Sequence, residues 1–308
     1  MAGRSRTSAD AQRRLLTLPQ LLGDQLRRLR MERGIGREAA GECLDGSVSK
    51  ISRIEVGEVG IKDRDLDRLL DLYGVADWRE RAAIQHIAAV SGSRQWWHQY
   101  GDVVADWFDC YLALEWTAEI IRTYELRFVP GLLQSPAYAR EVIRLRYCDP
   151  AEVDRRLALR LHRQRMLFER ERPVLWAIID EAALRQQIGT RAVMDEQLAF
   201  LSEAAQRENV QIQILPIRAG LRTGAGNSFT MFRLKSSHLA DVVYLEHLDN
   251  AEYLADTDRC DPYKRHLTEI TVAALNPRET ERALQEIAQG RDLTIPDRAR
   301  HQIVSASR

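Results

Sequence analysis

The sequence predicts a chain in two parts, a mainly α N-terminal bundle and a mixed α+β C-terminal domain. Three observations indicate this fold class. The 308 residues exceed the size of one small domain, and the 45% apolar content is that of a globular protein. In the N-terminal quarter, apolar residues recur at three- and four-residue steps, which is a helical period. After Pro173, continuous and alternating apolar runs typical of β-strands occur between helical segments.

The N-terminal part is expected to hold an arm and five short helices. Residues 1–19 are rich in arginine and serine and lack periodicity, so we expect a flexible basic arm. From about Leu21 the pattern predicts a first helix that ends at Gly34. Four further helices are expected, marked off by glycine-containing connections, at about 36–44, 47–55, 63–73 and 77–90. Together they predict a compact helical domain over residues 20–90.

Residues 91–135 are expected to be a helical connector that is rich in aromatic side chains. These are Trp96, Trp97, Tyr100, Trp107, Phe108, Tyr111, Trp116 and Tyr124. The simplest interpretation is hydrophobic packing that docks the N-terminal domain onto the rest of the chain or onto a second copy. A ligand cage built from the same rings is the alternative.

Residues 136–292 are expected to form an α+β regulatory and oligomerisation domain, followed by a tail over 293–308. It should start with helices, including an arginine-rich one over about 151–170. The expected strands are VLWAII, NVQIQILPI, NSFTMFRL and DVVYLEHL, and the closing helices lie at about 260–275 and 278–289. Asp180 and Glu181 follow the first strand without a recognisable catalytic partner, so we expect Asp180 to cap the next helix.

Three residues within 36–55 meet the steric needs of a helix-turn-helix. Gly41 is small enough for a close helix crossing, Asp45 tolerates a left-handed backbone, and Ile51 is apolar where the next helix must be buried. They are spaced four and six residues apart, as this motif requires. Ser47 is placed to cap the helix that follows the turn.

Burial of Ile51 and Ile54 would turn the opposite face of that helix outward. In a helix-turn-helix this face enters the DNA major groove, where arginine can read guanine and valine can touch a thymine methyl group. Arg37, at the start of the preceding helix, is expected to lie against backbone phosphates. The predicted DNA-contacting residues are therefore Arg37, Ser47, Val48, Ser49, Lys50, Ser52 and Arg53.

The charge pattern agrees with a nucleic-acid partner although the whole chain is neutral. The chain has 45 basic and 45 acidic residues, but residues 1–54 carry 11 Lys and Arg against six Asp and Glu. Residues 55–80 carry four against eight, so the positive field is local to the predicted motif. The arginines of the arm either reach into a minor groove or stay solvated.

The segment GIGREAAGECLDGSVSKISRIEVG resembles the helix-turn-helix of the Xre/phage-repressor family. The residues that fall in register with the usual pattern are Gly34, Glu38, Leu44, Ser47, Ile51, Ser52, Arg53, Ile54, Glu55 and Gly57. The resemblance implies that Val48, Ser49 and Arg53 are the base-reading positions. Asp45 and Gly46 stand where glycine and a small apolar residue are usual, so a looser turn is expected.

Most of residues 20–290 also resembles the WhiJ-like regulators, which are often described as antitoxin-like. The segments of the C-terminal part that carry this resemblance are WWHQY, LEWTAEIIRTYELRFVPGLLQSPAYAR, RQRMLFERERPVLWAIIDEAALRQQIG and VVYLEHLDNAEYL. The resemblance implies a DNA-binding regulator, often encoded beside a small partner protein, with a C-terminal domain of undefined biochemistry.

Several kinds of site are not expected. The four cysteines form no C-x-x-C pair and the seven histidines show no ligand spacing, so neither a metal site nor a cofactor is predicted. No apolar run is long enough to span a bilayer, and the N-terminus has no signal-peptide core. We therefore expect a cytoplasmic protein that associates with the nucleoid when it binds DNA.

The sequence thus predicts a sequence-specific transcription regulator rather than an enzyme. We expect a homodimer on double-stranded operator DNA, with its own promoter as a candidate operator. The expected effector is a small partner protein, with a small molecule as the alternative. The competing functions are an enzyme or a protein-interaction adaptor that uses the helix-turn-helix for targeting.

Overall fold

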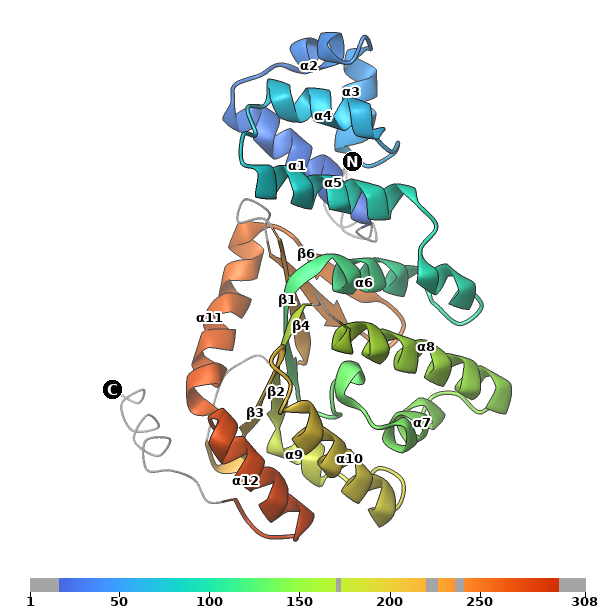
Figure 1. The fold of residues 1–308 in the computed structure, drawn as a ribbon, viewed down its shortest axis with the longest axis vertical. Helices are drawn as coiled ribbons and strands as arrows, with labels where there is room; N and C mark the ends of the chain where they lie inside the picture. Colours follow the sequence, from blue (N-terminus) through green and yellow to red (C-terminus); the bar gives the residue numbers. More distant parts are fainter. Residues whose placement is uncertain (1–16, 170–172, 220–226, 236–240, 294–308) are drawn as a thin grey trace, which may run out of the picture.

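The computed structural model of the chain describes residues 17–169, 173–219, 227–235 and 241–293. Helices occupy the N-terminal third, and a mixed sheet with helices on both faces forms the rest (Figure 1). The predicted fold class, mainly α followed by mixed α+β, is confirmed. Most of the expected arm, residues 1–19, and of the expected tail, residues 293–308, lies outside the described residues.

Five helices form the N-terminal group. They are α1 (Leu18–Glu32), α2 (Arg37–Cys43), α3 (Val48–Glu55), α4 (Asp63–Leu72) and α5 (Trp78–Gly92). Thr17 begins α1 through a reciprocal capping box with Gln20, which satisfies backbone donors that the first turn leaves open. The amphipathic faces of the helices bury one core, whose most enclosed side chains include Leu26, Ile51, Leu66 and Ile84.

One six-stranded sheet organises the described C-terminal part. Its strands are β1 (Ala118–Glu125), β2 (Val174–Asp180), β3 (Val210–Leu215), β4 (Phe229–Leu234), β5 (Val242–Glu246) and β6 (Ala251–Leu254). They lie in the order β3-β2-β1-β4-β5-β6. The β1–β2 and β2–β3 pairs are parallel, whereas β1–β4, β4–β5 and β5–β6 are antiparallel. The first strand in the sequence therefore lies at the centre of the sheet.

The expected helical connector at 91–135 is wrong over residues 118–125, which form β1. The helical prediction followed the density of aromatic residues, but the β-branched and aromatic side chains of AEIIRTYE favour an extended backbone. Both faces of this central strand are largely covered, so it lacks the clean apolar–polar alternation that marks a half-exposed strand. The α+β part thus begins before residue 136. The predicted strands also lack β6, a short edge strand of four residues.

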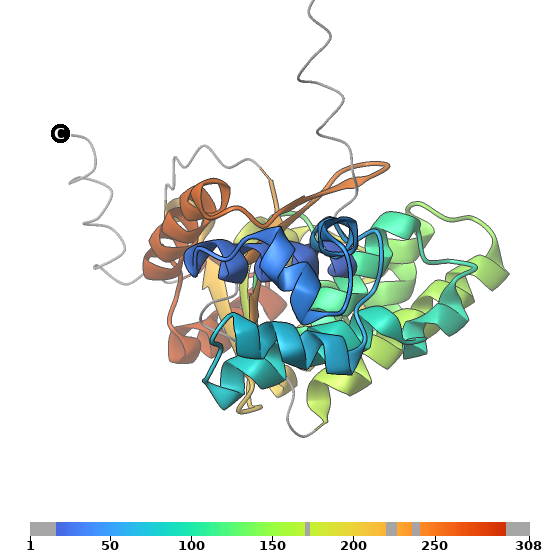
Figure 2. The ribbon, with the colours of Figure 1, turned by 90° about the horizontal axis from the view of Figure 1, so that it is seen from above.

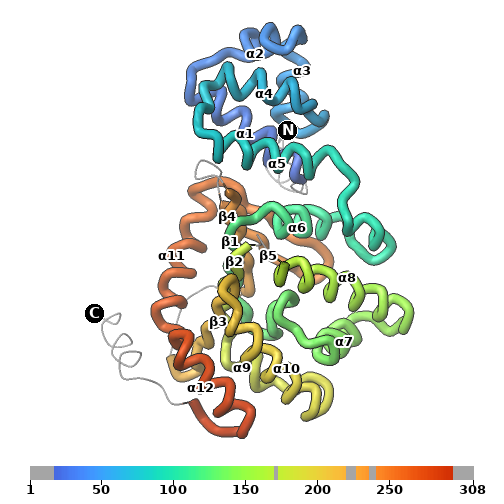
Figure 3. The backbone as a smooth tube through the Cα atoms, viewed as in Figure 1, coloured from blue at the N-terminus to red at the C-terminus, as the bar shows by residue number. Residues whose placement is uncertain are grey.

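A short 3₁₀ helix, η2 (Trp96–Tyr100), and α6 (Asp106–Thr117) join the N-terminal helices to the sheet. The tube in Figure 3 runs from α5 through α6 into β1. α6 contacts α1 and α5 as well as β1 and β4, and Trp97 is packed at the junction with its Nε1 donating to Asp109 at 2.8 Å. The aromatic residues therefore dock the two parts of one chain. Trp96 and Trp116 also line a pocket of about 350 Å³, its open mouth included, where a ligand cage would lie.

Helices cover both faces of the sheet. On one side lie α6, α7 (Pro136–Arg144), α8 (Pro150–Phe168) and α10 (Arg191–Ala204), and on the other lies α11 (Thr257–Ala273) (Figure 1). Figure 2 shows the same division from above, with the green helices opposite the orange ones. The remaining helices are η3 (Gly131–Leu133), α9 (Glu181–Arg185), η4 (Ile217–Ala219) and α12 (Pro277–Ala288).

Two local contacts close the C-terminal end of β2 and the free edge of β3. Asp180 caps α9 as predicted, because its carboxylate accepts a hydrogen bond from Ala182 N at 2.8 Å. Leu275 N donates to Ile214 O at 2.9 Å, so the chain between α11 and α12 pairs with the last part of the β3 edge. At that point the edge is not available to another chain.

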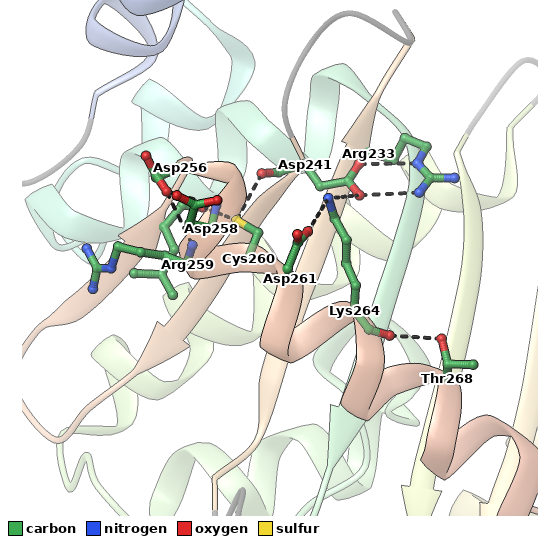
Figure 4. A network of polar contacts seen from close by, with 10 residues as sticks. Arg233, Asp241, Asp256, Asp258, Arg259, Cys260, Asp261, Lys264 and Thr268 are labelled. Atoms are coloured by element: carbon green, nitrogen blue, oxygen red, sulfur yellow. Dashed lines mark hydrogen bonds and ion pairs between the residues drawn. The ribbon is translucent and has the colours of Figure 1, made fainter.

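Asp241, just before β5, ties the β4–β5 pair to α11 (Figure 4). Its carboxylate accepts hydrogen bonds from Arg233 Nε and Nη2, both at 3.2 Å, and lies 3.8 Å from Lys264 Nζ. Its carbonyl oxygen accepts a hydrogen bond from Cys260 Sγ at 3.4 Å. Asp241 is buried, and the two cations compensate the cost of removing its charge from water.

Gly23→Ala is expected to destabilise the N-terminal helices. A Cβ at this position of α1 would lie 2.5 Å from Ile54 O and 2.6 Å from Glu55 O, and neither backbone atom can move without shifting α3. We expect a loss of about 1–3 kcal/mol in unfolding free energy, the usual cost of overpacking. Thermal unfolding followed by circular dichroism measures it. Gly60→Ala is the control, since its Cβ would meet nothing within 4 Å; equal losses would contradict the close approach of α1 and α3.

Candidate DNA-binding interface

The turn between α2 and α3 has the geometry that the sequence predicts. A Cβ added to Gly41 would lie 3.1 Å from Ser47 C, so α2 approaches the start of α3 closely. Asp45 has a φ of 49°, in the left-handed region that a turn of this kind needs. Ile51 is 1% exposed. The predicted roles of Gly41, Asp45 and Ile51 are confirmed.

Hydrogen bonds close this turn even though Asp45 and Gly46 depart from the usual pattern. Gly46 N and Leu44 N both donate to Gly41 O, at 2.9 and 3.0 Å. Ser47 caps α3 as predicted, because its Oγ accepts a hydrogen bond from Lys50 N at 3.2 Å. The turn is therefore hydrogen-bonded at both ends, and the looser turn expected from Asp45 and Gly46 stays a prediction.

The carboxylate of Glu55, the last residue of α3, joins three helices. Arg30 in α1 donates to it from Nε at 2.6 Å and from Nη2 at 3.2 Å, and Arg37 at the start of α2 donates from Nε at 2.9 Å. Arg30 Nη1 also donates to Ile35 O, at 2.7 Å, in the connection between α1 and α2. Arg30 and Glu55 are both buried. The end of α3 is therefore fixed against α1 and α2 by a buried, hydrogen-bonded ion cluster.

The electrostatics of this cluster favour the ionised form of Glu55. Burial by itself raises the pKa of the carboxyl, but the hydrogen bonds and charges of Arg30 and Arg37 outweigh burial and hold the pKa below its ordinary value. The contribution of the ionised group to stability is therefore complete above the ordinary glutamate pKa of about 4.3. It is lost as the pH falls through the lower pKa of the folded state.

The outer face of α3 holds most of the predicted DNA-contacting residues. Val48 is 42% exposed and the side chain of Arg53 is 57% exposed. Ser47 and Ser49 are exposed, while Ser52 is half-buried. Since Ile51 and Ile54 point into the core, these side chains form the surface that α3 presents to an approaching partner.

The three predicted cations differ in how strongly the protein holds them. Arg37 is bound to Glu55, and Lys50 Nζ lies 2.8 Å from Asp65 of α4, so Lys50 leans away from the middle of the outer face. Arg53 Nε is 3.7 Å from Glu58, an exposed contact that is weak in water. Arg53 is therefore the cation of this set that can most easily turn to a partner. The pairing of Lys50 and Arg37 has no signal in the sequence, because their acidic partners are 15 and 18 residues away.

The charge around α3 is asymmetric. Acidic residues line α4, including Asp63, Asp65, Asp67 and Asp71, and Asp45 at the turn is paired with Arg68 at 2.7 Å. α2 carries Arg37 against Glu38 and Glu42, so the exposed positive charge of the motif comes from α3, at Lys50 and Arg53. The acidic residues of α4 disfavour the approach of a polyanion along that helix.

Comparison with known families agrees with this geometry. A helix-turn-helix domain matches residues 21–84, which indicates DNA binding. A domain of unknown function (DUF5753) matches residues 108–286, more than half of the chain. The chain belongs to the DUF5753 family. In this member, the helix-turn-helix domain precedes a DUF5753 domain that extends from α6 into α12. Neither curated proteins nor solved structures gave a match.

The DUF5753 domain carries a polar cluster at the carboxyl end of β1, the edge at which open α/β sheets bind ligands. Thr123 Oγ1 lies 3.1 Å from Thr230 Oγ1 and 3.2 Å from Glu125 Oε1. Burial raises the pKa of Glu125 to about 7, although hydrogen bonds from Ser228 and Thr123 act in the opposite direction. The carboxyl therefore titrates near neutrality. Sequence reasoning missed Glu125 because the strand that carries it was expected to be helical.

Neither a metal site nor a membrane span is found in the part of the chain that the structure describes. Among the described residues, no group of three or more His, Cys, Asp and Glu side chains is arranged to hold a metal ion. None of the described helices is long and apolar enough to cross a bilayer.

Glu55→Gln is expected to lower the unfolding free energy of the helix-turn-helix domain by about 3–5 kcal/mol, because Arg30 would remain buried without its anion. Hydrogen exchange of the α1–α3 amides measures the loss locally. Glu58→Gln is the matched control, since Glu58 is in the following turn but 54% exposed, and it should cost less than about 0.5 kcal/mol. Equal protection in wild type and Glu55→Gln would show that the cluster does not hold α3.

Glu125 is expected to make the DUF5753 domain less stable as the pH rises. Because the pKa of Glu125 is raised to about 7 in the folded state, the unfolded chain loses this proton at a lower pH than the folded chain. The free energy of unfolding therefore falls between about pH 4.3 and pH 7 and then levels off. Glu125→Gln should remove this fall, gaining about 2 kcal/mol relative to wild type between pH 5 and pH 8. Urea unfolding at both pH values measures it. Glu119→Gln, an exposed change on the same strand, should follow wild type.

Proposed function

We propose that this chain is a sequence-specific transcription regulator that binds double-stranded DNA as a homodimer. The observation that carries the proposal is the outer face of α3, exposed at Val48, Ser49 and Arg53 and fixed from behind by Ile51 and Glu55. A helix with one face buried in a core and the other exposed, with an arginine on the exposed face, is suited to the major groove. The helix-turn-helix match supports the same assignment.

Each predicted residue has a role that its chemistry supports. Arg53 can donate two hydrogen bonds to a guanine edge, Ser49 can contact a base edge, and Val48 can pack on a thymine methyl group. Arg37, Ser47, Lys50 and Ser52 lie around this centre and are suited to phosphate contacts, which position the helix without reading sequence.

Dimerisation follows from the size of the reading surface. One α3 covers a short half-site, and two half-sites on adjacent turns of DNA multiply both affinity and specificity. The surface through which two copies would associate belongs to the DUF5753 domain in this proposal. The promoter of the gene that encodes this chain is a natural operator, since a regulator that binds there controls its own amount.

The finer family likeness also belongs to this proposal. We assign the motif to the Xre type on the residues in register from Gly34 to Gly57. We assign the whole chain to the antitoxin-like WhiJ group on the C-terminal segments that carry that resemblance, from WWHQY to VVYLEHLDNAEYL. The DUF5753 domain would then receive a signal from a small partner protein encoded nearby, or from a small-molecule ligand. A DNA-bound regulator of this kind works in the cytoplasm, on the nucleoid. An enzyme or an adaptor with a targeting helix-turn-helix is the alternative.

Arg53→Ala is expected to weaken binding to the preferred DNA site about 10- to 100-fold, the range for loss of one bidentate base contact. Binding to unrelated DNA should weaken less, so the variant also loses sequence preference. Fluorescence anisotropy with both DNAs at several salt concentrations measures affinity, preference and salt dependence together.

Arg79→Ala is the matched control for this experiment. Arg79 is an exposed arginine on α5, at the opposite side of the N-terminal helices from α2 and α3 (Figure 1), so its loss removes the same charge away from the proposed interface. It should leave sequence preference unchanged. If Arg53→Ala matched Arg79→Ala in both affinity and preference, α3 would not be the reading helix. If wild type bound no DNA, the enzyme or adaptor alternatives would stand.

A further inference from the structure

A half-buried arginine in the DUF5753 domain lacks an anionic partner among the residues that the structure describes. Arg122 lies in the middle of β1, opposite Trp176 of β2, and its guanidinium is 5.5 Å from the centroid of the Trp176 ring. It lies on the sheet face that α11 covers, because the next residue on that face, Tyr124, packs in the core beneath α11. The Nε atom of Arg122 is buried, and no hydrogen-bond acceptor reaches it within the described residues.

The charges around Arg122 do not supply the missing anion. Arg233 of β4 lies on the same face, since its Cα pairs with that of Ile120, two residues before Arg122. The nearby carboxylate of Asp241 is used by Arg233 and Lys264, and Lys264 has a second contact, at 3.4 Å, with Asp261 (Figure 4). Burial and the charge of Arg233 both lower the pKa of Arg122, with Asp241 only partly offsetting them.

A guanidinium in this position is costly unless something neutralises it. A half-buried charge without a counter-ion loses hydration and gains nothing in return. The ring of Trp176 offsets part of this loss through a cation–π contact, but it cannot accept the N–H hydrogen bonds. The planar donor fork of arginine matches the oxygens of a carboxylate or a phosphate, which would satisfy both the charge and the hydrogen bonds.

We propose that Arg122, with Arg233 and Lys264 beside it, binds a small phosphate- or carboxylate-bearing anion between β1 and α11. The site lies in the DUF5753 domain, away from the proposed DNA-reading helix α3 (Figure 1). Its existence does not depend on the proposed function. Its use as the effector site of a transcription regulator rests on that proposed function.

The test compares thermal unfolding of the full chain in inorganic phosphate and in sodium chloride at equal ionic strength, without DNA. A ligand that binds the folded state raises the unfolding temperature in a saturable way. We expect wild type to gain several degrees in phosphate or in the dicarboxylate glutarate, and the stronger of the two identifies the anion class. Arg122→Met, which keeps the length and apolar stem of the side chain, should lose this gain.

The same variant tests whether Arg122 has only a packing role. If Arg122 is an unpaired charge, Arg122→Met should unfold at a higher temperature than wild type in sodium chloride, because the uncompensated guanidinium is gone while a thioether still packs on Trp176. If Arg122 is needed only for packing or for its contact with Trp176, the variant should unfold at a lower temperature, which would overturn the proposal.

Two control variants separate this site from other effects of phosphate. Arg127→Met removes an exposed arginine just beyond the same strand and should keep the full response, as general salt effects act on both variants alike. Arg53→Ala should also keep the full thermal response to phosphate, because Arg53 lies on α3 and not in the proposed anion site. A loss of DNA binding can therefore be distinguished from a loss of anion binding. A response that persists in Arg122→Met, or that is absent from wild type, overturns the proposal.

Discussion

The helix-turn-helix domain of this molecule depends on the burial of one carboxylate. Glu55 is 2% exposed and accepts three hydrogen bonds from arginines of two other helices. A buried ion cluster of this kind adds little net stability over apolar packing, because desolvation consumes most of the attraction. What the cluster adds is a defined angle between α1 and α3, because the guanidinium of Arg30 and the carboxylate at the end of α3 fit together in one arrangement. The outer face of α3 is therefore presented in a fixed orientation, which a base-reading surface requires.

The same orientation is carried into the DUF5753 domain by packing rather than by charge. α6 contacts α1 and α5 while it also contacts the sheet, and Trp97 is enclosed at this junction. From α6 the chain enters β1, the central strand, without an intervening loop. A change in the middle of the sheet thus has a short, continuous path of packed elements to the helix-turn-helix domain. Spatial continuity shows that coupling is physically feasible, and a DNA titration with and without anion would measure it.

A structural feature could be predicted from the sequence where the residues that produce it are close together in the chain. The turn was predictable because the needs of Gly41, Asp45 and Ile51 are met within ten residues of one another. The capping roles of Ser47 and Asp180 were predictable for the same reason. The pairing of Arg30 with Glu55 spans 25 residues and leaves no periodic signal. β1 was missed because Ala118–Glu125 mixes charged and apolar residues without the strict alternation of a half-exposed strand. Its pairing with β2 and β4, which are far away in the sequence, makes it the central strand.

Comparison with Arg163, another arginine of the DUF5753 domain, shows how unusual Arg122 is. Arg163 of α8 is 7% exposed, yet its Nε and Nη2 donate to Glu115 at 2.9 and 2.7 Å, and its guanidinium also lies 5.3 Å from the ring centroids of both Phe108 and Tyr111. Arg163 is therefore a completed ion pair that the fold built for itself. Arg122 has the aromatic neighbour but neither a carboxylate nor any other acceptor for its buried Nε within the described residues. Arg233, by contrast, pairs with Asp241, and Arg160, which has no carboxylate partner among those residues, donates from Nη1 to Gln134 Oε1. The missing partner at Arg122 is for this reason better explained by an anion from outside the chain than by imperfect packing.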